Sequence, residues 1–320
     1  IQQELIDLGI EEAVAKRILG YAESSAKADT DRTTFQAMEA LVHNLNTMHS
    51  RAGAQTPFSS INYGTDTSPE GRMVIRNILK ATDAGLGHGE TCIFPIHIFK
   101  VKEGVNYNEG DPNYDLFKLS CKVSARRLFP NYVFLDAPFN LQYYKPGHPE
   151  TEVATMGCRT RVMGNVYDPE HEISYSRGNL SFTSINLPRL AIEAHHDEKL
   201  FYQKLDEMMA LVAQQLLDRF EIQAAKRVYN YPFLMGQGVW LDSDKLGPND
   251  EVREVLKHGT LSIGFIGLAE TLTALYGHHH GESDESQELG LKIVRHMRER
   301  MDQASEQYDL NFSLIATPAE

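Results

Sequence analysis

The chain has 320 residues, of which 42% are hydrophobic and 23% are charged, so it can bury a large core as one α/β unit or as two ordinary domains. Its formal net charge of −13 opposes binding to a DNA or RNA backbone, although free nucleotides stay possible as ligands. No stretch reaches the roughly 18 uninterrupted apolar residues of a membrane helix, and no signal peptide is recognisable, so we expect a cytoplasmic protein without membrane contact.

The first half of the sequence alternates between helical and extended patterns. Residues 1–17 are amphipathic and suit a short helix, and Thr33 or Thr34 is a candidate cap for a second helix. We expect the apolar stripe of that second helix in the core or at a subunit interface. The stripe consists of Phe35, Met38, Leu41, Val42, Leu45 and Met48. Beyond it we predict strands over 56–64, 91–101 and 131–139, a helix over 68–84, and a loop over 104–114.

The second half continues the same alternation. A strand over 178–187 precedes a long amphipathic helix around residues 200–217. The apolar segment 259–277 suits a strand or turn that leads into a buried helix, and a further helix over 285–310 precedes a final strand that runs into a loop. Strands that alternate with helices indicate an α/β protein with a mainly parallel sheet or barrel. We find no internal repeat and no firm domain boundary.

The three cysteines, Cys92, Cys121 and Cys158, are odd in number and form no C-x-x-C pair. This argues against a disulfide framework and against a thiolate metal site in this chain, so we expect no bound metal here. A special cysteine in this sequence is therefore a reactive one.

Cys158 lies in "ATMGCRTRV" (154–162), where it follows a glycine and has Arg159 and Arg161 nearby. A glycine-containing loop holds a sulfur away from regular packing, and neighbouring arginines favour the thiolate. A small buried hydrophobic residue is the alternative interpretation, and the residues alone leave both open. Hydrolysis by a Cys-His pair gains little support, because no signature ties a histidine to this cysteine.

Six blocks in order, "TPFSSINYGTD", "FPNYVFLD", "MGCRTRV", "RGNLSFTSINLPRLA", "GTLSIGFIGLAETL" and "SLIATPAE", resemble the catalytic barrel of the anaerobic, class III ribonucleoside-triphosphate reductases. They extend from residue 56 to residue 320. The resemblance implies a ten-stranded α/β barrel with a central finger loop, incomplete in this chain. Residues 1–320 would then be one catalytic barrel domain, with amino-terminal helices over 1–55 in a dimer and effector region and the barrel core over 56–320.

The resemblance also implies a radical reaction. Cys158 matches the finger-loop cysteine that becomes a thiyl radical and abstracts the 3′-hydrogen of the ribose, after which the 2′-hydroxyl leaves as water. Formate supplies the reducing equivalents in most members. Met156 matches an active-site methionine, and Asn179 matches an asparagine that holds the ribose hydroxyls. Without the resemblance, Met156 is a packing residue, and Asn179 satisfies main-chain groups where a strand begins.

Substrate phosphates need hydrogen-bond donors, and the terminal "ATPAE" resembles the phosphate loop of these reductases. Residues on the early strand are further candidates for substrate contact. Short polar stretches of this kind also occur in ordinary turns. The candidate substrate-binding residues are Ser59, Ser60, Asn62, Ala316, Thr317, Ala319 and Glu320.

Members of this family form homodimers in which a deoxynucleotide effector at the interface selects the substrate base. The helix through residues 34–48 is the part of this chain that suits such an interface. Its polar edge is the candidate effector site, although a solvated helix face is the alternative. The candidate residues are Gln36, Glu39, His43 and Asn46.

The sequence also departs from the family pattern. Full-length members end in a glycyl-radical segment, Arg-Val-x-Gly-Tyr, which follows zinc-binding cysteine pairs and is activated by a radical-SAM enzyme. Neither feature occurs here, and the ATP-binding cone and the second active-site cysteine of many members lie upstream of the matched region. We therefore expect an internal fragment that is inactive alone. Two alternatives stay open: another glycyl-radical enzyme of the formate-lyase or dehydratase type, and a nucleotide-binding dimerisation module without catalysis.

Overall fold

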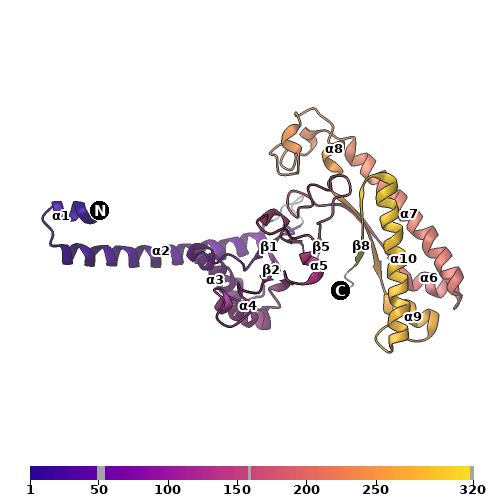
Figure 1. Cartoon of the computed structure of the whole chain (residues 1–320), viewed down its shortest axis with the longest axis horizontal. Coiled ribbons are helices and arrows are strands. Elements are labelled where there is room, and N and C mark those ends of the chain that lie inside the picture. Colours follow the sequence, from indigo (N-terminus) through magenta and orange to yellow (C-terminus); the bar gives the residue numbers. More distant parts are fainter. Residues whose placement is uncertain (49–54, 158–159, 318–320) are drawn as a thin grey trace. The chain divides into compact units, whose positions relative to one another are not determined.

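The computed structural model describes residues 1–48, 55–157 and 160–317, which fold into two compact units (Figure 1). Unit 1 consists of Ile1–Tyr144 and Val153–Arg161, and unit 2 consists of Lys145–Glu152 and Val162–Glu320. Helices and parallel strands in both units confirm the expected α/β class. The described residues form two three-stranded parallel sheets and one two-stranded hairpin, so ten barrel strands are not seen in this chain. The assignment of 1–320 to one catalytic domain stays a prediction.

Unit 1 is built around the parallel sheet β1-β2-β3, whose strands are joined by helices α3 and α4. Its core brings Ile75 and Leu79 of α3 against Phe99 of β2 and Leu116 and Val123 of α4. The elements of unit 1 are α1 (Gln2–Asp7), α2 (Glu12–Thr47), β1 (Ser60–Tyr63), α3 (Pro69–Ala84), β2 (Ile96–Val101), α4 (Tyr114–Arg127), β3 (Asn131–Phe134), α5 (Pro138–Leu141), β4 (Thr155–Met156) and β5 (Thr160–Arg161).

Helix α2 is much longer than the sequence pattern predicts. It begins at Glu12, so neither Thr33 nor Thr34 caps it, and the predicted helix over 1–17 is instead α1 followed by a break at Gly9, whose φ is 83°. Five alanines and several other good helix formers between residues 12 and 32 carry the helix through this region, which has no proline and one glycine, Gly20. The carboxyl-terminal half packs in the core of unit 1, as one interpretation of its apolar stripe predicts, through Met38, Leu41 and Val42 against α3.

Prolines set several strand boundaries that the predictions placed too widely. The predicted strand 56–64 is β1 from Ser60, and 91–101 is β2 from Ile96, because Pro57 and Pro95 precede them and lack the N–H that a sheet requires. The predicted strand 131–139 ends at Phe134, since Pro138 opens α5. Helix α4 was not predicted, although Leu116, Ser120 and Val123 follow helical spacing and are buried.

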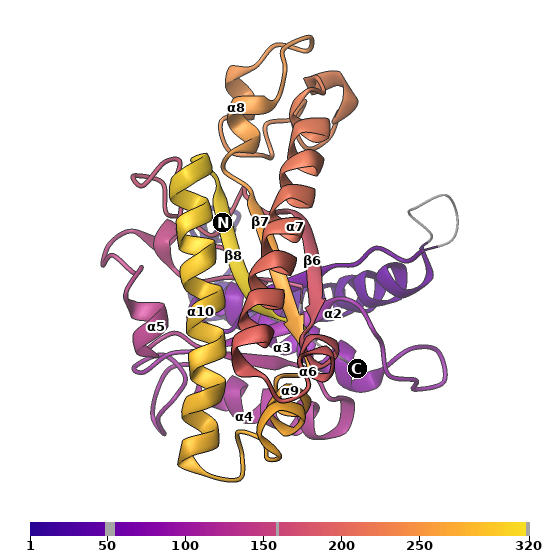
Figure 2. The ribbon, with the colours of Figure 1, turned by 90° about the vertical axis from the view of Figure 1, so that its right-hand side faces the viewer.

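Unit 2 is built around the parallel sheet β6-β7-β8, with α7 and α10 lying across one face (Figure 2). The strands and helices predicted over residues 178–310 are confirmed. In addition to three short 3₁₀ turns, the elements are β6 (Asn179–Asn186), α6 (Leu187–Ala194), α7 (Glu198–Ala224), α8 (Arg253–Leu256), β7 (Thr260–Ile266), α9 (Leu268–Tyr276), α10 (Asp284–Tyr308) and β8 (Asn311–Ala316).

The two faces of the unit 2 sheet differ in polarity. Leu261, Ile263 and Phe265 alternate along β7 and belong to the core beneath the helices. The opposite face is mixed: it carries the apolar Phe182, Ile266 and Ile315, together with residues that bear hydroxyl or amide groups. We call this set of hydroxyl and amide residues the polar face, and its members are Asn179, Thr260, Ser262, Ser313, Ser184 and Thr317.

Candidate functional site

The predicted reactive cysteine lies between the two strands of the hairpin β4-β5. Thr155 pairs with Arg161 and Met156 pairs with Thr160 in antiparallel register. Cys158 and Arg159 fall outside the described residues. The structure describes the two stems on either side of them, Thr155–Met156 and Thr160–Arg161. Gly157 begins the turn with a φ of 57°, a left-handed conformation that favours glycine. The loop position of Cys158 stays a prediction, and Met156 is a half-buried residue on the entering stem.

The entering stem is held by the side chain of Asn62 on β1. The Thr155 N–H donates to Asn62 Oδ1 at 3.0 Å, and Asn62 Nδ2 donates to the Thr155 carbonyl at 2.9 Å. Thr155 is only 7% exposed. The carboxamide of Asn62, which the sequence suggested as a substrate contact, is thus engaged with the main chain of the loop stem.

Arg161 on the opposite stem contacts α5. Its guanidinium donates to Asn140 Oδ1 and to the Phe139 carbonyl, and it lies 4.8 Å from the centre of the Phe139 ring. These contacts direct the charge of Arg161 toward α5. One of the two arginines expected to make the surroundings of Cys158 electropositive therefore has a structural role on the hairpin.

The serines before Asn62 differ in their environment. Ser59 Oγ is buried and has no hydrogen-bond partner among the described residues. Ser60 begins β1, is half-buried, and lies in register with Ile96. A buried hydroxyl without a partner is costly, so the Ser59 hydroxyl is available to a bound ligand or to water.

In unit 2, Asn179 is the first residue of β6 and its side chain is exposed on the polar face. Asn179 Oδ1 accepts a hydrogen bond from Thr260 Oγ1. The amide nitrogen of Asn179 is thereby turned away from this bond and keeps its donor capacity. Ser262 Oγ and Ser313 Oγ lie 2.7 Å apart further along the same face.

The chain before Asn179 is fixed by the buried guanidinium of Arg177, which is 6% exposed. Its nitrogens donate at 2.8–3.0 Å to main-chain carbonyls from three separate segments. Burial lowers the pKa of Arg177 to about 10. Because two of these carbonyls follow β5 closely in sequence, Arg177 holds the chain that leaves the Cys158 loop. The accepting residues are Met163, Gly164, Ile173 and His258.

The predicted phosphate segment lies at the other end of the polar face. Thr317 Oγ1 lies 2.7 Å from Ser184 Oγ, and the Thr317 N–H donates to the Phe265 carbonyl at 3.0 Å. Ala316 is the exposed last residue of β8, whereas Ala319 and Glu320 fall outside the described residues. Asn179 is in register with Thr260 of β7, which is in register with Asn311 of β8. Thr317 lies six positions after Asn311, or about 20 Å further along the strand direction. Asn179 and Thr317 therefore lie on the same face of the sheet but at opposite ends of it.

The predicted effector residues lie in the carboxyl-terminal half of α2. Gln36 and His43 are exposed and Glu39 is half-buried. Asn46 instead holds a neighbouring segment, because its Oδ1 accepts from the N–H groups of Ile93 and Phe94 and its Nδ2 donates to the Phe94 carbonyl. The structure thus leaves three of the four side chains at or near the surface and engages the fourth with the main chain.

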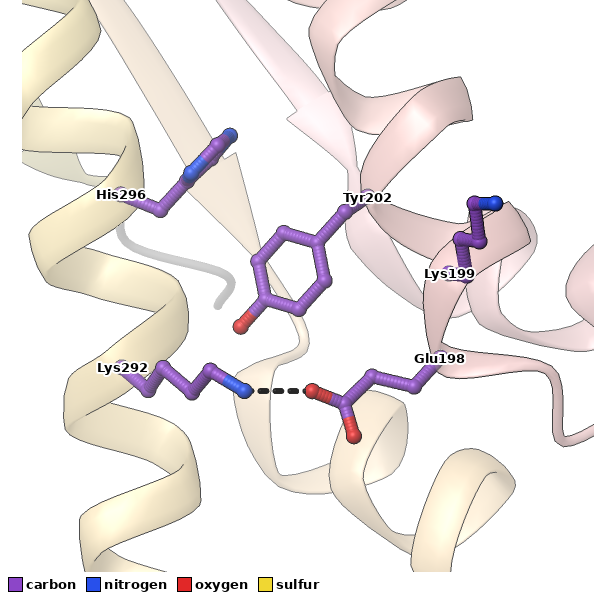
Figure 3. A pocket seen from close by; sticks show the side chains of 5 residues that line it. All are labelled: Glu198, Lys199, Tyr202, Lys292 and His296. Atoms are coloured by element: carbon purple, nitrogen blue, oxygen red, sulfur yellow. Dashed lines mark hydrogen bonds and ion pairs between the residues drawn. The ribbon is translucent and has the colours of Figure 1, made fainter.

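Unit 2 also has a groove of about 470 Å³ between α7 and α10 (Figure 3). Lys292 Nζ lies 2.5 Å from Glu198 Oε1, so these two charges compensate one another, and His296 Nε2 lies 2.7 Å from Asp206 Oδ1. Burial, together with the charge of Glu198, raises the pKa of Tyr202 to about 12. None of the described candidate residues lines this groove. The lining residues are Glu198, Lys199, Tyr202, Lys292 and His296.

Two wider properties bear on function. Among residues 1–48, 55–157 and 160–317, no group of three or more His, Cys, Asp or Glu side chains is arranged to hold a metal ion. In the same described part of the chain, no helix combines the length and apolar character that crossing a membrane requires.

The described residues define an α/β protein with two parallel sheets and a short hairpin whose strands flank Cys158 in the sequence. The chain belongs to the anaerobic ribonucleoside-triphosphate reductase family, because the family model matches residues 11–320. The anaerobic ribonucleoside-triphosphate reductase of Salmonella typhimurium is 34% identical over 305 residues, which cover 93% of this chain and 41% of that protein. The chain therefore spans less than half the length of the curated relatives it matches.

Solved structures are similar in fold. The anaerobic ribonucleotide reductase from Thermotoga maritima with citrate in the active site matches with a TM-score of 0.56 and 15% identity, over 91% of this chain and 50% of that one. The same enzyme in complex with dATP and CTP matches with a TM-score of 0.56 and 14% identity, over 89% of this chain and 45% of that one.

Sequence reasoning missed the residues that hold the site in place. Asn62 was identified for its polarity and position, not for its contact with a residue 93 positions away. Arg177 was not identified at all, although an arginine between a loop and a strand is a signal for a side chain that binds main-chain carbonyls.

Proposed function

We propose that the protein containing this chain reduces ribonucleoside triphosphates to 2′-deoxyribonucleoside triphosphates under anaerobic conditions, by radical chemistry at Cys158. The observation that carries the proposal is the family match over residues 11–320, with Cys158 in the loop between β4 and β5. The polar face of unit 2 adds support, since ribose hydroxyls need hydrogen-bonding partners of this kind.

Membership of this family implies a glycyl-radical enzyme. We further propose that the radical resides on a segment outside this chain, that a radical-SAM activase generates it, that formate is the reductant, and that a separate segment binds zinc. When present, the radical supplies the one-electron chemistry that makes the Cys158 sulfur reactive. The residues of this chain contribute binding and orientation.

For the substrate, we propose contacts at three places. The buried Ser59 hydroxyl, which has no partner among the residues that the structure describes, donates to a substrate oxygen, and Ser60 lies beside it. The Asn179 amide nitrogen donates to a ribose hydroxyl, while its oxygen is held by Thr260. Main-chain groups around Ala316 and Thr317, together with Ala319 and Glu320, meet the phosphates. Met156 on the loop stem borders the reductant.

For the fold, we propose that the two three-stranded sheets are parts of the ten-stranded barrel of this family, with the β4-β5 loop as its finger loop. The fold similarity to the Thermotoga maritima enzyme supports this proposal. A barrel encloses the inner face of its strands, which suits a radical that must be kept from solvent.

For partners, we propose a cytoplasmic homodimer with deoxynucleotide or ATP effectors at a site that includes Gln36, Glu39 and His43. A structural relative was solved in complex with dATP and CTP, which supports an effector and a substrate of these classes. The exposed position of Gln36 and His43 on one face of α2 is compatible with an interface.

The proposal is tested on the longer protein with its activase, formate and ribonucleoside triphosphate under anaerobic conditions. We expect deoxynucleotide product from the wild type and none from Cys158→Ser. Cys121→Ser is the matched control, because Cys121 is an exposed cysteine on α4 and its loss should leave turnover unchanged. Product from Cys158→Ser, or no product from the activated wild type, would overturn the proposal.

A further inference from the structure

The contact between Asn62 and the loop stem is a side-chain imitation of strand pairing. One carboxamide accepts from the N–H of Thr155 at 3.0 Å and donates to the carbonyl of the same residue at 2.9 Å. A neighbouring strand offers the same two groups to a residue it pairs with. Asparagine supplies both from one side chain, whereas aspartate lacks the donor at neutral pH and alanine lacks both groups.

The hairpin needs such support because it is very short. Strands β4 and β5 have two residues each, and an isolated two-stranded hairpin is marginally stable at best. Pairing with β5 fixes Thr155 within the hairpin, but it does not fix the hairpin against β1. Asn62 supplies that second constraint from the middle of β1, where its main chain is already in register with Ile98 of the sheet.

We propose that Asn62 is a positioning residue that sets where the stem of the Cys158 loop lies against β1, and that it is not a substrate ligand. The inference rests on the proposed function. Met156 directly follows Thr155, and Ser60 lies two residues before Asn62 on β1. One side chain therefore fixes the loop stem against the strand that carries the proposed substrate serines. Both polar atoms of its amide are engaged in this task, which fixes the orientation of the side chain and leaves only the second N–H of Nδ2 as a donor.

Kinetics of the longer protein separate the two roles. We expect Asn62→Asp to lower kcat at least tenfold at pH 8 and to leave KM within twofold, because the misplaced loop reacts poorly while substrate contacts remain. A carboxylate still accepts from the Thr155 N–H but repels its carbonyl. Protonation restores a donor, so the ratio of variant to wild-type kcat should rise as pH falls toward 5.5.

A matched control is Asn106→Asp. Asn106 is another amide of unit 1 that holds main-chain groups, accepting from the Lys102 N–H and donating to the carbonyls of Gly64 and Lys100. It does not touch the hairpin. We expect its kcat to stay within twofold of wild type below its melting temperature. Equal kcat losses in both variants, or a raised KM with unchanged kcat in Asn62→Asp, would overturn the proposal.

A measurement on the 320-residue chain does not depend on turnover. Hydrogen exchange of the Thr155 amide should accelerate at least tenfold in Asn62→Ala, whereas the β1 amides that pair with β2 should exchange at wild-type rates. An unchanged exchange rate of the Thr155 amide in Asn62→Ala would refute the proposed positioning role of Asn62. If exchange accelerates in Asn62→Ala but the activated wild type makes no deoxynucleotide, the proposed function fails, whereas the role of Asn62 in positioning the stem is supported.

Discussion

At the scale of single residues, Arg177 carries a buried positive charge stabilised by main-chain carbonyls. Its guanidinium reaches segments from Met163 to His258. An ammonium has three donors and no planar fork, so Arg177→Lys should leave at least one buried carbonyl without a partner. We expect the free energy of unfolding to fall by about 2–4 kcal/mol, measured by urea denaturation of the 320-residue chain.

Arg126 provides the comparison for that substitution. It forms an ion pair with Asp83 at 2.8 Å, but its side chain is 57% exposed. Exposed pairs contribute little, so Arg126→Lys should change the free energy of unfolding by less than about 1 kcal/mol. Equal changes in the free energy of unfolding for Arg177→Lys and Arg126→Lys would show that the hydrogen bonds of Arg177 to main-chain carbonyls do not stabilise the fold more than an exposed ion pair does.

A second residue-scale prediction concerns His97, which is fully buried on β2. Its ring nitrogens lie 3.1 Å from Tyr63 Oη and 3.2 Å from Thr82 Oγ1. Burial lowers the pKa of His97 to about 4, below the ordinary value of 6.5. Between these values the unfolded chain binds a proton that the folded chain does not, so stability is complete above pH 6.5 and is lost as pH falls toward 4.

The size of this effect follows from the two pKa values. Between pH 7 and pH 5 we expect His97 to account for about 2 kcal/mol of lost unfolding free energy. The test compares urea denaturation of wild type and His97→Gln at both pH values. The variant should be less stable at pH 7 and should lose less on acidification, whereas parallel losses would contradict the buried neutral state.

At the scale of elements, Ser68 caps α3, the helix that the sequence predicts over 68–84. Its hydroxyl accepts from the Gly71 N–H at 3.0 Å. Ser68→Ala should therefore lower the free energy of unfolding by about 1 kcal/mol. Ser24→Ala is the matched control, because Ser24 is exposed inside α2, where alanine is the better helix former and should stabilise slightly. Changes of the same sign in thermal denaturation would contradict the cap.

Elements were predictable where a local pattern matched the tertiary environment. The strand over 178–187 and the helix over 68–84 were predicted from their own sequence patterns, whereas the division of the strands between two parallel sheets was not predicted. Helix α2 was not predictable from a cap at Thr33 or Thr34, since a helix without a breaker continues through a candidate cap. The proline-bounded strands were placed too widely because the predictions followed the apolar runs and gave too little weight to the prolines within them, which lack an N–H.

The residues of the candidate site could be predicted where a family motif identifies them, but the contacts between those residues could not. The "MGC" segment identified the loop, and the structure adds a hairpin stem around it. The sequence could not show that Asn62 pairs with Thr155, since that contact spans 93 positions and depends on the fold. Nor could spacing show that Asn179 and Thr317 lie on one face of a sheet at opposite ends, because this needs the register of three strands.

At the scale of the whole molecule, the Cys158 loop lies close in sequence to the point where the chain passes from unit 1 to unit 2. Asn62 fixes the entering stem in unit 1, and Arg177 fixes the chain two residues beyond β5 in unit 2. The chain passes from one unit to the other between Arg161 and Val162, three residues after Cys158. Substitutions at Asn62 and Arg177 therefore disturb the same loop through separate cores, and their effects on unfolding should be additive.

The last prediction concerns effectors, and it rests on the proposed site on α2. A ligand that binds only the folded state stabilises it by mass action, by about 2.7 kcal/mol at a hundredfold excess over Kd. We expect dATP or dTTP to raise the melting temperature of the 320-residue chain by several degrees, and ribose 5-phosphate or pyrophosphate to leave it unchanged. His43→Ala should reduce the nucleotide response without lowering the melting temperature of the free chain, because the side chain is exposed. Equal responses to nucleotide and to pyrophosphate would mean that α2 binds phosphate without recognising the base, and the effector proposal would fail.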